Sequence, residues 1–276
     1  MLLNMSRIGV LTAVAILVAS TIVSARYNRS PESEIDPNVF LIDQEEYLGK
    51  KINGDLKLLD MTGREFTLGE NLSKPMILVL SYYKCDGACS VTNIELLNLL
   101  ESIERFNIGN DYHVITVSFD SHDNSETMEM FTRELGMPAD FKKGWTIARI
   151  KDADEIKPFT SSLGFNFFWS PRDRTFFHPS VFIFVTPEGR VSRYLYSSTV
   201  SSKDVELALI ETAKEQIKPT EITSLVLGFC YSYNYKDGKY SLNIPLFVAV
   251  GSLGLGISLF LGSVFIFKKK RKSMEV

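Results

Sequence analysis

The sequence predicts an α/β fold, a sandwich in which helices cover a central mixed sheet. A near-continuous apolar run at residues 75–83, rich in β-branched side chains, is typical of a strand buried on both faces. Apolar residues at helical spacing follow at 91–106, and a second apolar run at 112–119 completes a β-α-β unit. This alternation of strand and helix patterns is what an α/β sandwich requires.

The remaining elements are taken in chain order. Two short alternating runs between Leu56 and Leu68 flank Thr62-Gly63 and predict a hairpin. After the β-α-β unit, the patterns predict helices at 125–135, 154–163 and 202–215, and a strand pair at 181–186 and 191–196 that turns at Pro187-Glu188-Gly189.

Residues 1–25 have the layout of a secretory signal peptide, with Arg7, an apolar run from Ile8 to Ala19, and a small-residue ending at Ala25. An uncleaved N-terminal anchor is the alternative, although the run is shorter than the ~20 residues that a membrane span needs. Both interpretations predict export of the chain after this segment. The polar, aperiodic residues 26–46 predict a tether ahead of one domain at 47–217.

Residues 245–267 contain no charged side chain and would form a helix about 34 Å long, against a hydrocarbon core of ~30 Å. They predict a C-terminal transmembrane helix in contact with membrane lipid. The basic tail, residues 268–276, predicts a cytoplasmic end and therefore an extracytoplasmic domain on the periplasmic side of a bacterial membrane. The tyrosine-rich segment 218–244 would lie at the lipid headgroups or pack on the domain.

The charge balance excludes one class of partner. Residues 26–243 hold 24 of the 30 basic residues and 32 of the 33 acidic ones, a net charge of −8. Nucleic acids and anionic lipids are bound through basic surfaces. We therefore expect neither as a partner of this region.

Two of the three cysteines, Cys85 and Cys89, lie where the strand at 75–83 is followed by a helix. Ligands of α/β proteins bind at the carboxyl ends of strands, and a helix N-terminus favours the thiolate. A static disulfide is the structural alternative, but it would close a very short loop and restrict the unfolded chain little. The pair therefore predicts a reactive or metal-binding site. The third cysteine, Cys230, is expected to be a buried small hydrophobe rather than a third redox partner.

Of the three histidines, only His178 is placed to meet these cysteines, because it directly precedes the apolar strand at 181–186. His113 lies at the start of a strand, and His122 lies in the loop 120–124. Two thiolates and one imidazole form a soft site that suits Cu(I) and, with further ligands, Cu(II). The set is incomplete for structural zinc, which takes four ligands.

These features resemble the Sco/SenC family of copper chaperones for cytochrome c oxidase assembly. The resemblance covers about 47–217, and its motifs are the strand, Cys-x-x-x-Cys and helix around Cys85 and Cys89, His178 before a strand, the turn 187–189, and Cys230-Tyr231-Ser232-Tyr233. It implies a thioredoxin-like fold and copper ligation by Cys85, Cys89 and His178. It also implies the binuclear copper site of the copper-containing oxidase subunit as client, with other periplasmic copper or thiol carriers as further partners.

The chain departs from the family pattern at the prolines. Asp86 and Ser90 stand where the family usually has proline, and Ser121 follows Asp120 where Asp-Pro is usual. The prolines are not ligands, so their loss affects loop rigidity, and with it redox potential and copper affinity.

The leading hypothesis is a metallochaperone, which requires no covalent catalysis. The alternative is an extracytoplasmic thiol–disulfide oxidoreductase, in which Cys85 attacks the disulfide of an exported protein and Cys89 resolves the mixed disulfide. Peroxide reduction is a weaker third hypothesis, because nothing around Cys85 marks a peroxide-activating Arg and Thr.

Overall fold

The computed structural model describes residues 40–84, 88–217, 231–234, 239–242 and 244–272. Side chains are described over 40–84, 91–217 and 248–262. The chain divides into a unit 1–41 and a unit 42–276, and the helices and strands named below lie in the second. The predicted signal peptide 1–25, most of the predicted tether, Cys85 and Cys230 lie outside the described residues.

The centre of the domain is a mixed sheet of seven strands in the order β2-β1-β5-β4-β3-β8-β9. The central strand β3 is parallel to β4 and antiparallel to β8, as the prediction of a mixed sheet requires. The strands are β1 Lys57–Asp60, β2 Glu65–Thr67, β3 Met76–Ser81, β4 His113–Ser118, β5 Trp145–Ile150, β8 Val181–Val185 and β9 Val191–Tyr196.

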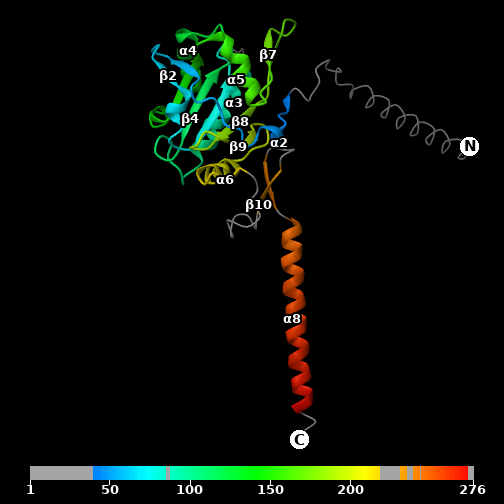
Figure 1. Cartoon of the computed structure of the whole chain (residues 1–276). Helices are drawn as coiled ribbons and strands as arrows, with labels where there is room; N and C mark the ends of the chain where they lie inside the picture. Colours follow the sequence, from blue (N-terminus) through cyan, green and yellow to red (C-terminus); the bar gives the residue numbers. More distant parts are fainter. Residues whose placement is uncertain (1–39, 85–87, 218–230, 235–238, 243, 273–276) are drawn as a thin grey trace, which may run out of the picture. The chain divides into compact units, whose positions relative to one another are not determined.

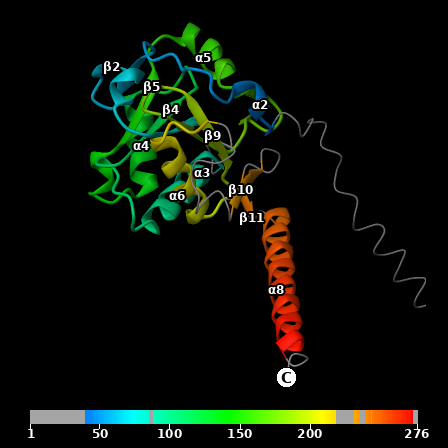
Figure 2. The ribbon, with the colours of Figure 1, turned by 60° about the horizontal axis from the view of Figure 1, so that its bottom comes forward.

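Helices cover both faces of this sheet (Figures 1 and 2). Ile77 and Val79 of β3 pack into the cluster formed with α3 Ala88–Glu101, α4 Ser125–Leu135 and α6 Ser202–Ala213. The alternate residues of β3 face a second cluster that includes α5 Ile156–Ser162. In the turned view, α5 lies on one side of the strands and α6, α3 and α4 lie on the other. This is the predicted thioredoxin-like α/β sandwich.

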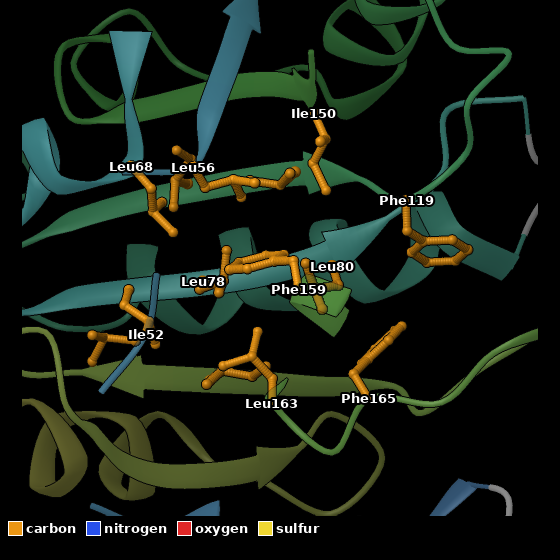
Figure 3. Packing of buried hydrophobic residues seen from close by; sticks show 14 of the residues in the cluster. Ile52, Leu56, Leu68, Leu78, Leu80, Phe119, Ile150, Phe159, Leu163 and Phe165 are labelled. Atoms are coloured by element: carbon orange, nitrogen blue, oxygen red, sulfur yellow. The ribbon is translucent and has the colours of Figure 1, made fainter. Parts of the chain in front are cut away.

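The second cluster is rich in large side chains. Leu78 and Leu80 of β3 pack with Phe159 of α5, and Phe119 and Phe165 extend the cluster toward the carboxyl end of β3 (Figure 3). Both faces of the central strand are therefore buried, which explains why residues 75–83 form a continuous apolar run.

Most predicted elements are confirmed, with shifted ends. The unit β3-α3-β4, the hairpin β1–β2, and the pair β8–β9 occur as predicted, and α4 has the predicted bounds. The predicted helix at 154–163 consists of a short 3-10 turn, η4 Ala153–Glu155, followed by α5. The sequence patterns did not reveal β5, the short helices α2 Gln44–Tyr47, η2 Leu68–Asn71 and η3 Phe141–Lys143, or the hairpins β6 Phe168–Ser170 with β7 Thr175–Phe177 and β10 Tyr231–Asn234 with β11 Lys239–Leu242.

The structure corrects the prediction of a transmembrane helix at 245–267. In the part of the chain that the structure describes, no helix combines the length and the apolar character needed to cross a bilayer. Helix α8 runs from Ile244 to Lys272. The membrane lipid partner, and the extracytoplasmic location inferred from this span, are corrected with it.

Candidate functional site

The three predicted ligands differ in how far the structure describes them. His178 is described in full, between β7 and β8. Cys89 lies in the first turn of α3, where the backbone is described and the side chain is not. Cys85 lies in 85–87, outside the described residues. The described part of the site therefore consists of His178 and the residues at the carboxyl ends of β3 and β4.

His178 is half-buried among aromatic rings at the carboxyl edge of the sheet. Its ring centroid lies 6.0 Å from that of Tyr82, 5.2 Å from that of Phe119, and 5.7 Å from that of Phe165, on which it stacks. Tyr82 directly follows β3, and Phe119 directly follows β4. The imidazole is thus held beside the end of the strand that leads to Cys85.

The tautomer of His178 can be assigned from its hydrogen bond. The Nδ1 atom lies 2.9 Å from the carbonyl oxygen of Pro179, and a carbonyl oxygen only accepts. In the neutral imidazole the proton is therefore on Nδ1, and the lone pair is on Nε2. Metal-binding histidines are commonly oriented in this way, with the second nitrogen donating to a backbone carbonyl.

A polar contact ties the histidine segment to the end of β3. The hydroxyl groups of Tyr82 and Thr175 are hydrogen-bonded at 2.7 Å. Phe176 adds a ring contact with Tyr82, at 5.1 Å between centroids. Because Thr175 and Phe176 belong to β7, which ends one residue before His178, this hairpin positions the histidine. The hairpin was not predicted from sequence, since its two strands are only three residues long.

The chain just before Cys85 is held from the other side of the sheet. The Tyr83 phenol donates to the carbonyl oxygen of Thr116 at 3.0 Å and also to that of Ala148. Burial raises the pKa of the Tyr83 phenol, and the Asp123 carboxylate adds to the rise. The backbone N–H of Tyr83 donates to the Asp123 carboxylate at 2.9 Å.

Asp123 is itself buried, in the loop after β4. Burial raises the pKa of its carboxyl, while hydrogen bonds from Ser118, Tyr83 and Thr127 oppose the rise. In the sequence Asp123 is one of several polar residues in a loop, so its burial could not be predicted from the local pattern.

A buried polar network fixes α3 against the sheet one turn after Cys89. The Asn93 side-chain amide donates to the Ser81 hydroxyl at 3.4 Å, and its carbonyl oxygen accepts from the Thr116 hydroxyl at 2.8 Å. Trp145 Nε1 donates to the same hydroxyl at 3.0 Å. Buried amides and hydroxyls need such partners, and when satisfied they specify one docking of the helix.

The other two histidines lie elsewhere. His113 begins β4 and so lies at the opposite end of this strand from Phe119. His122 lies after β4, is exposed, and its Nδ1 lies 2.8 Å from Asp120 Oδ1. Within the described residues, no group of three or more His, Cys, Asp or Glu side chains could hold a metal ion.

Comparison with known proteins points to the same family. The SCO1/SenC family model matches residues 44–213. A proposed electron transfer protein from Aquifex aeolicus VF5 is 28% identical, with a TM-score of 0.56 and coverage of 63% of this chain and 99% of that one. A SCO1/SenC family lipoprotein from Bacillus anthracis is similar in fold, at 16% identity, a TM-score of 0.50, and coverage of 60% and 99%.

Arabidopsis thaliana ScoI, a structure determined with copper bound, is 17% identical to this chain, with a TM-score of 0.48 and coverage of 61% and 99%. A search of curated proteins gave no match. The family model covers more than half of the 276 residues, in the region that forms the α/β sandwich. The chain belongs to the SCO1/SenC family.

Proposed function

We propose that this chain is a copper chaperone that binds one copper ion through Cys85, Cys89 and His178. The client is the binuclear copper site of cytochrome c oxidase, as the family resemblance implies. The observation that carries the proposal is the orientation of His178. Its Nδ1 proton is bound to the Pro179 carbonyl, and its ring lies beside Tyr82 at the end of the strand that leads to Cys85.

The chemistry of these donors fits copper transfer. Two thiolates and a neutral imidazole are soft and borderline ligands, which favour Cu(I). Binding releases the two thiol protons, and delivery exchanges the three ligands for those of the acceptor without any change in the oxidation state of copper. The aromatic rings around His178 limit the access of water to its imidazole.

Copper titration of the reduced full chain tests this proposal. We expect one equivalent of Cu(I) bound in competition with a chromophoric chelator, and no tight binding by the double variant Cys85→Ser/Cys89→Ser. His178→Ala should weaken binding tenfold or more, because it removes one of three ligands. His113→Gln is the matched control, since His113 begins β4 at the opposite edge, and it should bind as wild type does.

Two results would contradict the proposal at different points. Unchanged affinity in His178→Ala would show that the histidine is not a ligand. Absence of copper binding by the reduced wild-type chain would reject the chaperone function itself.

A thiol–disulfide oxidoreductase is the second candidate, and one observation favours it. The Aquifex aeolicus protein that is 28% identical to this chain is described as a proposed electron transfer protein. In this function Cys85 attacks a substrate disulfide, Cys89 displaces the product thiol, and the two cysteines become a disulfide. The rate of reduction of a model disulfide should then vanish in Cys85→Ser and be nearly unaffected in His178→Ala.

A further inference from the structure

Asp123 is a buried carboxylate at the edge of the sheet that carries the candidate site. Asp123 is 3% exposed to solvent. One oxygen, Oδ2, accepts the Tyr83 N–H at 2.9 Å and the Ser118 hydroxyl at 2.5 Å. The other oxygen, Oδ1, is buried without a hydrogen-bond partner among the described residues.

Burying an ionised carboxylate in this position costs free energy of folding. Removing an ionised group from water costs several kcal/mol unless hydrogen bonds replace its hydration, and here the hydrogen bonds from Tyr83 and Ser118 both go to Oδ2, with the Thr127 side chain as a further stabilising neighbour. Capping of α4 does not account for it, because Asn124 supplies the N-cap side chain. The contact that distinguishes Asp123 is the one it makes to the backbone of the neighbouring strand's end, at Tyr83.

Tyr83 is the anchor of the segment that leads to Cys85, two residues further along. Its phenol donates to the backbone carbonyls of Thr116 in β4 and Ala148 in β5, and its ring packs on Phe131 at 4.7 Å between centroids. These contacts hold the side chain, and the bond from the Tyr83 N–H to Asp123 holds the backbone directly.

We propose that Asp123 is a positioning residue for the cysteine pair, because it orients the backbone ahead of Cys85 by accepting the Tyr83 N–H. The proposal rests on the proposed function of Cys85 and Cys89. Its consequence is that the pair binds copper more tightly, and closes into a disulfide more readily, than it would without the Asp123 acceptor.

Three variants of the full chain separate positioning from charge and from stability. Asp123→Ala removes the acceptor, whereas Asp123→Asn keeps one carbonyl oxygen for the Tyr83 N–H and removes only the charge. Asp204→Ala is the matched control. Asp204 is 9% exposed, and its Oδ2 likewise accepts a backbone N–H and a serine hydroxyl, both from Ser201, at 2.8 and 2.6 Å.

Two equilibria are measured for each variant. One is the Cu(I) affinity of the reduced chain. The other is exchange with glutathione, in which the two thiols give two electrons and two protons to glutathione disulfide, which becomes two glutathione molecules. For Asp123→Ala we expect both constants to fall about tenfold, so that the reduction potential of the pair rises by about 30 mV.

The controls then decide the interpretation. Asp123→Asn should stay within about threefold of wild type, and Asp204→Ala should lose stability without changing either constant. Wild-type constants in Asp123→Ala would overturn the proposal, and equal losses in Asp123→Ala and Asp123→Asn would assign the effect to charge instead. If Asp123→Ala does not fold, Asp123→Leu fills the same space without an acceptor and is measured in its place.

The outcome can be separated from that of the proposed function. If the wild-type chain binds no copper, the chaperone function fails, while the glutathione equilibrium still tests Asp123. If wild type binds copper and Asp123→Ala binds it equally well, only the positioning role fails.

Discussion

Arg193 is the most deeply buried charged residue in the described part of the chain, at 1% exposure in β9. Its Nη2 lies 2.7 Å from Glu211 Oε2 of α6, and its Nη1 donates to the carbonyl oxygen of Ile217 at 2.7 Å. One guanidinium therefore joins a strand, a helix and the end of the described domain. The planar fork of donors in arginine makes this possible, and lysine could not reproduce it.

Replacing Arg193 with Ala should lower the free energy of unfolding by about 3 kcal/mol, because removing one partner of a buried pair leaves the other charge and the backbone carbonyls without compensation. Urea unfolding followed by circular dichroism measures this. Arg64→Ala is the control: its pair with Asp60 is exposed on the arginine side, and its loss should cost at most about 1 kcal/mol. Equal losses in the two variants would mean that burial of Arg193 adds nothing.

Two glycines at the ends of elements are required for different reasons. Gly136 ends α4 at φ 60°, the left-handed region that favours glycine, and its N–H donates to the Arg133 carbonyl. Gly144 precedes β5 at a negative φ, where any residue is tolerated by the backbone. A Cβ at Gly144 would overlap the backbone of Gly109, at 2.6 Å from its Cα, whereas a Cβ at Gly136 would meet nothing within 4 Å.

The two alanine variants should therefore differ in size of effect. Gly136→Ala is expected to lower the free energy of unfolding by about 1 kcal/mol, the cost of a left-handed alanine. Gly144→Ala should cost about 3 kcal/mol, because two backbone segments must move apart. Thermal and urea unfolding of both variants decide the point, and a smaller loss in Gly144→Ala than in Gly136→Ala would contradict the close approach of Gly109 and Gly144.

The two hydrophobic clusters share the strands of one sheet, so the domain should unfold as one cooperative unit. Trp145 is 4% exposed in the cluster under α3, α4 and α6, and Phe159 is 2% exposed in the cluster on the other face. A substitution in one cluster should therefore shift the unfolding transition reported by a side chain in the other cluster, because neither cluster persists without the strands between them.

Phe159→Ala tests this coupling across the sheet. We expect it to lower the free energy of unfolding by about 3 kcal/mol or more, and to shift the unfolding transition of Trp145 fluorescence by the same amount as the circular dichroism transition. Trp169, which is 48% exposed, is replaced by Phe both in the Phe159→Ala variant and in its reference protein. Trp145 is then the one tryptophan that contributes to the fluorescence signal. Separate midpoints for the two signals would show that the faces unfold independently.

The sequence by itself was sufficient for elements whose local pattern is strong. The apolar runs of β3 and β4 reflect burial on both faces, and α4 has an N-cap asparagine, an amphipathic face and a C-terminal glycine. The cysteine spacing, His178, the turn 187–189 and the order of strands and helices together indicated the family, which the family model confirms. The metal-ligand roles of Cys85, Cys89 and His178 stay predictions.

Other features depend on partners far along the chain. β5 was not predicted, because its short run is stabilised by pairing with β4 and β1, whose residues lie about thirty and ninety positions away. The apolar run at 245–267 led to a predicted span, but among the described residues no helix has the length and apolar character needed to cross a bilayer.

Local sequence therefore determined the fold class, the order of the main elements and the chemistry of the candidate ligands, because periodicity and residue type are local properties. Only the tertiary structure decided that Asp123 is buried against Tyr83, that Thr175 bonds to Tyr82, and that the His178 ring lies beside Tyr82 and Phe119. These arrangements arise where the ends of separate strands meet, and packing over long sequence distances, rather than any local pattern, sets them.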